Sequence, residues 1–176
     1  MSDAVQMLRE QHAEVTALFH KLERLRSPRT CAELFRAIDS RLRDHTIVEE
    51  TIFYPAFRQR ARDRGRAEIT EALHQHDEVK ALLDRIEQLS SAEYTFKHQI
   101  AELKRAVTHH VLEEESTILP QAQRIFSEAE LDDLAQRMIQ RASIHSPAYQ
   151  LPGHKTATVL RDTVRHAGET LSKLTS

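Results

Sequence analysis

Two patterns of histidine and glutamate occur twice in this 176-residue chain, at nearly the same separation. The run Glu10-Gln11-His12-Ala13-Glu14-Val15 returns as His74-Gln75-His76-Asp77-Glu78-Val79, an offset of 64 residues from His12 to His76. A His-x-x-x-Glu pattern, with proline six residues after the glutamate, begins at His45 and returns 65 residues later at His110. The chain is therefore a duplicated unit, and each copy supplies one lone histidine and one His-x-x-x-Glu.

Together the two copies supply four imidazoles and two carboxylates, which is a ligand set for a pair of metal ions. The candidate metal ligands are His12, His45, Glu49, His76, His110 and Glu114. A set of imidazoles and carboxylates without thiolate suits iron, manganese or zinc rather than a soft ion. The two glutamates can each bridge both ions, and dinuclear catalytic sites hold their metals about 3.5–4 Å apart.

The apolar periodicity, together with the positions of glycine, proline and capping residues, predicts four long helices in an all-α, antiparallel up-down-up-down bundle. Only three glycines and five prolines interrupt the chain. The first two expected helices run from about 3 to 26 with Ser2 as the cap, and from 30 to about 62 behind a Thr30–Glu33 capping box. Gly65 separates the second helix from the third, and Ser90-Ser91 separates the third from the fourth, which ends at about 125. Pro55 and Pro120 lie at matched places, one turn or so before the second and fourth helices are expected to end or kink.

The last fifty residues repeat nothing in the first part of the chain. Ser127 and Glu130 form a further capping box, which predicts a short fifth helix at roughly 128–142. A loop should follow at 143–153, and residues 155–174 have a weak helical pattern. We therefore expect a bundle domain at 1–126, with its copies at about 3–62 and 67–125, and a C-terminal helical extension at 127–176 that packs on the bundle.

The six candidate ligands interrupt seams of the helices that should otherwise be apolar. A buried unpaired imidazole or carboxylate costs several kcal/mol, so such residues need partners. Residues four apart share a helix face, so His45 with Glu49 and His110 with Glu114 should point into the bundle as pairs. The competing interpretation is that each is an ordinary core or surface residue, which six residues in matched register make improbable.

Several neighbouring side chains have less defined roles. Glu50 and Glu115 follow the two bridging candidates and are either solvated or hydrogen-bonded to metal-bound imidazoles. Tyr54 has no counterpart, because the second copy carries Leu119 there. Tyr54 is either a core residue or a phenolate ligand that a bend at Pro55 aims inward. The remaining histidines are expected to lie outside the metal set: His20, His74, His98, His109, His145, His154 and His166.

The charge balance and composition exclude several kinds of partner. Twenty-five basic residues against 27 acidic ones give no field that favours nucleic acid. No apolar run of 18 residues is present, so we expect no membrane span. The single cysteine, Cys31, excludes an internal disulfide and suits a reducing compartment. These features predict a cytoplasmic protein that is a monomer or a weak homodimer.

These motifs resemble the hemerythrin-like, or HHE cation-binding, family over about residues 3–125. The resemblance implies a non-haem di-iron centre, two iron ions with an oxo or hydroxo bridge, held by the six residues above and with Tyr54 as a further candidate. Oxygen-carrying members have a fifth histidine one turn before the third-helix ligand. Ala72 occupies that position here, so the resemblance does not favour reversible O₂ carriage.

The chain is also similar to small bacterial hemerythrin-like proteins that decompose hydrogen peroxide. The similarity rests on the ligand set, on Phe53-Tyr54-Pro55 and on a short match at Ser146-Pro147-Ala148-Tyr149. It implies a catalase-like reaction through diferrous and diferric states. The alternative is a protein that binds or senses O₂, NO or iron without turnover. The cysteine-bearing amino-terminal segment of the related iron–sulfur repair proteins is not seen, so a repair role is less supported.

Overall fold

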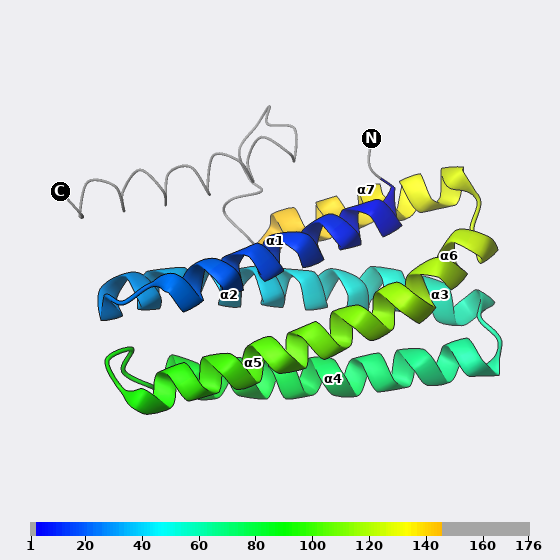
Figure 1. The fold of residues 1–176 in the computed structure, drawn as a ribbon. Coiled ribbons are helices and arrows are strands. Elements are labelled where there is room, and N and C mark those ends of the chain that lie inside the picture. The colour runs from blue at the N-terminus through cyan, green and yellow to red at the C-terminus, as the bar shows by residue number, and fades with distance from the viewer. Residues whose placement is uncertain (1–2, 146–176) are drawn as a thin grey trace.

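Four antiparallel helical rods form a bundle in the computed structural model, which describes residues 3–145 (Figure 1). The first and third rods are single helices, whereas the second and fourth each contain a π-helical turn, η1 or η2, between two α-helices. The elements are α1 Ala4–Arg24, α2 Pro28–Val48, η1 Glu49–Phe53, α3 Tyr54–Arg60, α4 Asp63–Glu87, α5 Tyr94–Glu113, η2 Glu114–Ile118, α6 Leu119–Ile125 and α7 Glu128–His145. The predicted all-α, up-down-up-down four-helix bundle is confirmed.

The π-helical turns lie at matched places in the two copies, and each starts at a candidate bridging glutamate. Tyr54 N–H donates to Glu49 O, and Leu119 N–H donates to Glu114 O, both across five residues. The proline that follows each of these donors has no N–H for an α-helical bond to the carbonyl four residues earlier. The prolines thus widen one turn, and the two rods end one turn or so later, at Arg60 and Ile125, as expected from the sequence. Turns of this π type are frequent at functional sites.

The predicted starts of the first two helices are wrong in detail. Asp3, not Ser2, caps α1, because its side chain accepts from Gln6 N–H. The second rod begins at Pro28, a residue that suits the first turn because it needs no N–H there. Thr30 consequently lies inside the helix, where its hydroxyl donates to Ser27 O rather than forming a capping box.

Gly65 lies within α4 rather than between two helices. A Cβ at this position would come within 2.9 Å of Ala61 Cβ, 3.2 Å of Gln121 Oε1 and 3.2 Å of Phe57 Cε1. The glycine therefore allows the start of α4 to approach the ends of the second and fourth rods closely. In the sequence alone, a glycine that permits close helix packing cannot be distinguished from a glycine that breaks a helix.

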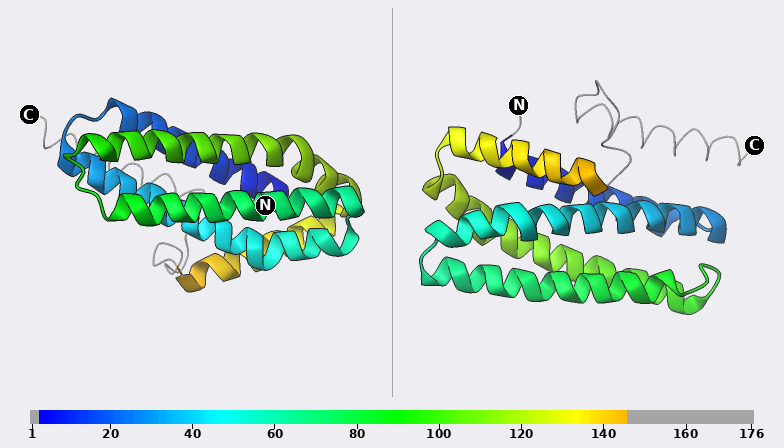
Figure 2. Two further views of the ribbon diagram at one scale, coloured as in Figure 1. Left: turned by 90° about the horizontal axis from the view of Figure 1, so that it is seen from below. Right: turned by 180° about the vertical axis from the view of Figure 1, so that it is seen from behind.

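The fifth helix, α7, is present and begins at the predicted capping box. Ser127 N–H donates to Glu130 Oε2 at 2.9 Å, and Glu130 N–H donates to Ser127 Oγ at 3.4 Å. The helix continues to His145, three residues beyond the expectation, and contacts α1, α2 and η1. It lies along α1 and α2, away from α4 (Figure 2). The predicted remainder of the loop and the weak helix at 155–174 fall outside the described residues.

The bundle contains two apolar clusters. One includes Phe53, Phe57 and Leu119 together with Leu134 and Met138 of α7. The other includes Phe19, Phe35, Leu83 and Phe96 toward the opposite end. The six histidines and glutamates belong to neither cluster, although they are buried, so the molecule has a polar layer between two apolar cores.

No helix among residues 3–145 combines the length and the apolar character needed to cross a membrane.

Candidate metal centre

The structure brings together all six residues that the sequence pointed to. His12 comes from α1, His45 from α2, His76 from α4 and His110 from α5, while Glu49 and Glu114 begin the two π turns. Each is at most 6% exposed. Burial of this many ionisable groups in one layer is costly unless they serve one another or an ion.

The four imidazoles form two pairs with equal spacing. His12 Nε2 lies 3.2 Å from His45 Nε2, and His76 Nε2 lies 3.2 Å from His110 Nε2. Two imidazoles on adjacent positions of one ion, at metal–nitrogen distances of about 2.0–2.1 Å, would place their nitrogens about 3 Å apart. Each pair therefore has the spacing of two terminal ligands on one ion.

The two carboxylates lie between these pairs. Glu49 Oε2 is 3.2 Å from His45 Nε2 and 3.1 Å from His76 Nε2, so it touches one imidazole of each pair. Glu114 Oε2 is 3.2 Å from His12 Nε2. Glu49 Oε1 and both carboxylate oxygens of Glu114 are buried without a hydrogen-bond partner in the described part of the chain. Unsatisfied buried acceptors of this kind are the expected sign of a cation site.

The described cluster offers two groups of donor atoms that are close enough together to hold a metal ion. His12, His45, His110 and Glu114 form one group, and Glu49, His76 and His110 form the other. Their ligand atoms lie within 4.8 Å of one another in each group. His110 belongs to both groups, and either group has enough donors to hold a metal ion.

Every imidazole of the cluster is fixed through its second ring nitrogen. His12 Nδ1 lies 2.9 Å from Glu115 Oε1, and His76 Nδ1 lies 2.9 Å from Glu50 Oε1. These contacts cross between the copies, because the glutamate of each copy holds the lone histidine of the other. Glu50 and Glu115 are thus hydrogen-bonded to the imidazoles, which was the second of the two sequence interpretations, and not simply solvated.

The other two imidazoles are fixed within their own copy by glutamines. His45 Nδ1 donates to Gln11 Oε1 at 2.8 Å, and His110 Nδ1 donates to Gln75 Oε1 at 3.1 Å. An Nδ1–H held by an oxygen acceptor presents Nε2 as the lone-pair donor to a metal. Sequence reasoning missed both glutamines, although their signal was present: each directly precedes a lone histidine in the duplicated run.

The protonation of the metal-free cluster follows from burial and from these contacts. Burial lowers the pKa of His12, but Glu114 and Glu115 outweigh this effect and raise the pKa to about 9. Burial likewise lowers the pKa of His76, and Glu49 and Glu50 raise it to about 9. Burial, with the neighbouring imidazoles, lowers the pKa of His110 to about 3. Without metal the cluster therefore holds protons on two imidazoles, and a cation must displace them.

The two carboxylates differ in their pKa values. Burial raises the pKa of Glu114 to about 7, and the adjacent charge of Glu49 acts in the same direction. Burial also raises the pKa of Glu49, but His45 and His76 more than offset it and hold that pKa well below its usual range. A divalent ion in contact with both groups would favour the ionised form of each.

Tyr54 lies against the cluster. Its hydroxyl donates to Glu49 Oε2 at 3.2 Å, and its ring stacks on His76 with centroids 5.5 Å apart. Residues five apart are about 140° apart around an α-helix, so this contact depends on the wider turn η1. Burial raises the pKa of Tyr54 well above its usual value, with Glu49 and Glu114 acting in the same direction. The second copy has the apolar Leu119 here, which makes the cluster asymmetric.

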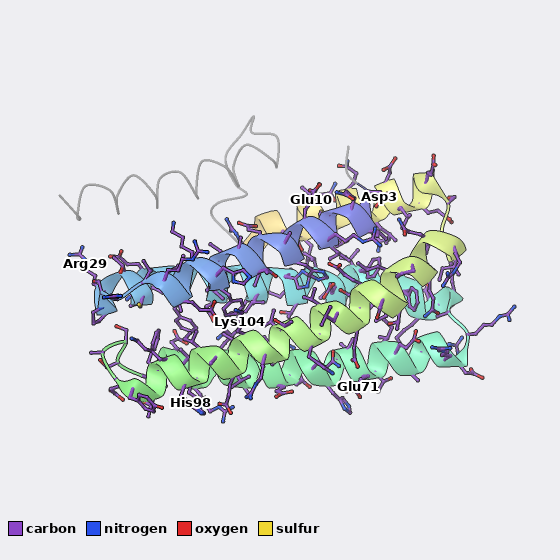
Figure 3. All side chains as sticks on the ribbon, in the orientation of Figure 1. Asp3, Glu10, Arg29, Glu71, His98 and Lys104 are labelled. Carbon is purple, nitrogen blue, oxygen red and sulfur yellow. The ribbon has the colours of Figure 1, made fainter. Side chains whose placement is uncertain are left out.

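The remaining described histidines lie away from the cluster. His20, His74, His98 and His109 are exposed, and Figure 3 shows His98 on the outside of the bundle. His145 ends α7, and His154 and His166 fall outside the described residues.

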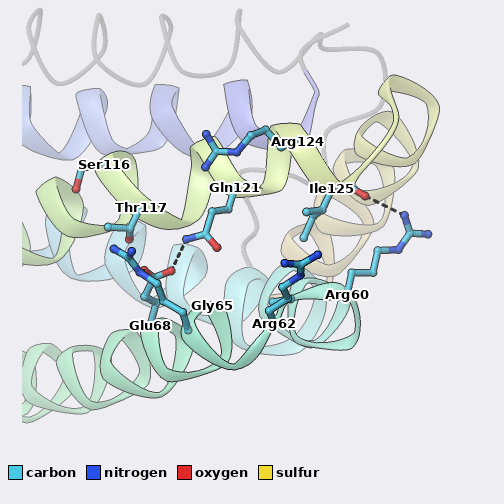
Figure 4. Close-up of a pocket in the computed structure, with 11 residues that line it drawn as sticks. Arg60, Arg62, Gly65, Glu68, Ser116, Thr117, Gln121, Arg124 and Ile125 are labelled. Atoms are coloured by element: carbon cyan, nitrogen blue, oxygen red, sulfur yellow. Dashed lines mark hydrogen bonds and ion pairs between the residues drawn. The ribbon is translucent and has the colours of Figure 1, made fainter.

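Two cavities lie beside the fourth rod. One of about 190 Å³ reaches the cluster and is lined by Glu68, Glu71, Ala72, Gln75, His110, Glu113, Glu114, Thr117 and Ile118. A larger one, of about 460 Å³, lies at the end of the bundle among Arg60, Arg62, Arg64 and Arg124 (Figure 4). The larger cavity does not include a histidine, so size alone does not identify the chemical site. The two cavities share Glu68 and Thr117.

The side chains that contact the Nδ1 atoms of the imidazoles should strengthen the binding of metal at Nε2. We expect Glu115→Ala, which removes the carboxylate from His12, to weaken metal binding by about 10–100-fold. Glu115→Gln keeps an acceptor oxygen and should lose less. Titration of the metal-free variants with a competing chelator measures the affinity. Glu87→Ala, on an exposed part of α4, is the control, and an affinity of Glu115→Ala equal to this control would contradict the role of Glu115.

Comparisons with known proteins agree with the helical bundle and with the candidate metal centre described above. The family model of the hemerythrin HHE cation binding domain matches residues 3–122. The crystal structure of a hemerythrin HHE cation binding domain-containing protein, the Rv2633c homolog from Mycobacterium kansasii, superposes with a TM-score of 0.69. It is 24% identical, and the match covers 92% of this chain and 99% of the other. At this identity the superposition establishes the fold.

Two curated proteins are also similar in sequence. A DNA nickase of Nostoc sp. (strain PCC 7120) is 31% identical over 112 residues, which are 64% of this chain and 31% of the nickase. An uncharacterized hemerythrin-like protein of Schizosaccharomyces pombe is 27% identical over 86 residues, 49% of this chain and 42% of that protein. The matches thus span less than half the length of either relative.

Proposed function

The chain belongs to the hemerythrin HHE cation-binding family, and from this premise we propose that it holds a non-haem di-iron centre that decomposes hydrogen peroxide. The proposed ligands are His12, His45, Glu49, His76, His110 and Glu114. The overall reaction converts two peroxide molecules into two waters and one O₂, so it balances without an outside reductant. When bound, a pair of iron ions supplies two-electron redox chemistry by alternating between diferrous and diferric states.

The observation that carries the proposal is the position of two buried carboxylates between two imidazole pairs, with three carboxylate oxygens that have no hydrogen-bond partner among residues 3–145. Glu49 touches an imidazole of each pair, and Glu114 has two buried oxygens without a hydrogen-bond partner among residues 3–145. The donor atoms are nitrogen and oxygen only, which suits iron. The carboxylates offer the bridging positions that a dinuclear centre requires.

The side chains around the ligands would perform distinct tasks. Gln11, Glu50, Gln75 and Glu115 hold the imidazoles with Nε2 directed into the cluster. Tyr54 keeps its hydroxyl proton and donates a hydrogen bond to Glu49, which orients that carboxylate. Ala72 lines the cavity beside His110 and Glu114, so one side of the cluster is not filled by a side chain. A small substrate such as peroxide fits that space.

The rival function is binding or sensing of O₂, NO or iron without turnover. Both functions use the same ligands, and the open space beside Ala72 suits a small ligand in either case. Fold and ligand set do not by themselves fix the reaction. The activity of the nickase relative is not carried over, since the matched part is 31% of that protein.

Steady turnover of peroxide by the iron-loaded protein distinguishes the two. We expect sustained O₂ release, measured with an oxygen electrode, at many molecules per chain. Ala72→His should place an imidazole in the open space and slow the release by about tenfold or more, the change that one such interaction of about 1.4 kcal/mol produces. No turnover by the iron-loaded wild type would favour the binding function, and equal turnover in wild type and Ala72→His would show that the space beside Ala72 is not the substrate position. Ala37→His on α2 is the control, because Ala37 is partly buried against the apolar cluster and lies eight residues, about two helical turns, before His45.

Tyr54 is tested separately by the visible spectrum of the ferric protein. If its phenolate binds iron, the wild type shows a phenolate-to-iron charge-transfer band and Tyr54→Phe lacks it. The hydrogen bond to Glu49 and the high pKa of the phenol instead favour a protonated Tyr54. We therefore expect similar visible spectra for the two proteins, and a band that disappears in Tyr54→Phe would make Tyr54 a ligand.

A further inference from the structure

The two copies of the duplicated unit differ most strongly in the side chains that lie just outside the cluster. In the second copy, α4 and η2 enclose the 190 Å³ cavity, which is lined by four carboxylates: Glu68, Glu71, Glu113 and Glu114. The offsets of 64 and 65 residues identify the equivalent positions in the first copy. Glu68, Glu71, Ala72, Glu113, Thr117 and Ile118 correspond to Ala4, Met7, Leu8, Val48, Ile52 and Phe53.

The first copy is closed at these positions. Ala4, Leu8, Val48 and Phe53 are fully buried in the apolar cluster that includes α7, and Met7 and Ile52 pack against it. The helix α7 contacts α1, α2 and η1, so it covers this side of the bundle. The second copy has Ala72 in place of Leu8 and Thr117 in place of Ile52, and these smaller or polar side chains leave the space open.

The open cavity joins solvent to the buried ligands. Glu71 is exposed and lies on the outer side of α4 (Figure 3), and the Glu113 side chain is half exposed. At the inner end are His110 and Glu114, and the carboxylate of Glu114, which is 1% exposed, has no hydrogen-bond partner in the described chain. This buried, unpartnered acceptor indicates that the carboxylate-lined cavity receives a cation rather than only water.

The charges around the cavity favour cations. The nearest arginine of the neighbouring cavity, Arg64, is paired with Glu68 at 3.1 Å, and Gln121 also donates to Glu68. Glu71 and Glu113 lie at the outer end, where Glu113 accepts from the Gln75 amide and has the exposed imidazole of His109 3.5 Å from its other oxygen. A cleft lined by one sign of charge raises the local concentration of the opposite sign and its rate of arrival. The other void among the imidazoles, of about 20 Å³ between Val15, Leu42 and Val107, has room for about one water.

We propose that the cavity between α4 and η2 is the route by which divalent metal ions reach the cluster, that Ala72 and Thr117 keep it open, and that Glu71 and Glu113 attract the cation at its mouth. The route rests on the proposed function only in requiring that the cluster binds metal. Peroxide turnover can fail while the route stands, because uptake of the ion is measured without peroxide.

Metal uptake by the metal-free protein tests the route. The probe is Co²⁺, which takes imidazole and carboxylate ligands as iron does and is not oxidised during mixing, so that its absorption reports arrival at the cluster. Ala72→Leu with Thr117→Ile copies the side chains of the closed copy. We expect this variant to reach the same final cobalt content as wild type, with uptake slower by about tenfold or more, as a barrier higher by about 1.4 kcal/mol gives. Unchanged uptake overturns the route, and a lower final content overturns it too, because it would show that the space belongs to the ligand sphere.

Surface variants test the charge component without altering the packing. Glu71→Gln with Glu113→Gln should slow uptake several-fold at low salt, and this difference should shrink as salt is added, because exposed charges are screened. Glu87→Gln, an exposed carboxylate near the far end of α4, is the matched control and should take up cobalt as wild type does. Equal uptake by the double variant and this control at low salt would contradict the role of the two glutamates.

Discussion

Replacing Glu114 by alanine is expected to remove both metal ions, not one. Its two carboxylate oxygens are buried and have no hydrogen-bond partner in the described chain, although Glu114 Oε2 lies 3.2 Å from His12 Nε2. Because we assign each glutamate to a bridging position, loss of either carboxylate takes a ligand from both ions. Metal analysis after loading and desalting should fall from about two ions per chain to near zero, and Glu49→Ala should behave in the same way.

The neighbouring carboxylate provides the control for this result. Glu115→Ala removes a glutamate one residue away that touches only the outer nitrogen of His12, so it should weaken binding but retain metal at saturating concentration. Circular dichroism of each variant confirms that the helices persist. Two tightly bound ions in Glu114→Ala would show that Glu114 does not bridge, whereas one retained ion would make it a terminal ligand.

Removal of metal from the wild-type protein should lower its melting temperature strongly. Four imidazoles and two carboxylates share a buried layer between the two apolar clusters, where Glu49 Oε1 and both Glu114 oxygens have no hydrogen-bond partner in the described chain. An ion bound only by the folded state stabilises it by about 4 kcal/mol at a thousand times its dissociation constant. For a chain of this length each kcal/mol is worth about 2–4 °C, so we expect a fall of roughly 10 °C after chelation.

Differential scanning calorimetry with and without chelator measures this shift, with metal loss verified by analysis. The Glu114→Ala protein is the control, because the chelator should have no effect on a chain that holds no metal. An unchanged wild-type transition after verified metal loss would mean that the cluster does not couple metal binding to folding.

The sequence predicted the bundle and the candidate cluster because both depend on local periodicity that is repeated. His45 and Glu49 share a helix face in any α-helix, and the matched spacing in the second copy made an accidental pattern improbable. The hydrogen bonds of Glu50 to His76 and of Glu115 to His12 could be suggested but not decided, because they join different rods across the duplication.

Features that depend on packing between rods could not be predicted. The π turns place Tyr54 against Glu49, a contact that an ordinary helical wheel excludes. Gly65 marks a close helix approach rather than a break, and the roles of Gln11 and Gln75 become evident only when their histidine partners are placed. The closed and open sides of the cluster likewise depend on where α7 packs.

The central proposal is a di-iron centre held by two imidazole pairs and two bridging glutamates. Metal analysis of the purified, iron-loaded chain, combined with its optical spectrum, tests it most directly. The expected result is about two irons per chain with oxo-bridge absorption in the near ultraviolet. A chain that retains no iron under loading conditions, or that saturates with one ion and lacks the near-ultraviolet band, would contradict the proposed dinuclear centre.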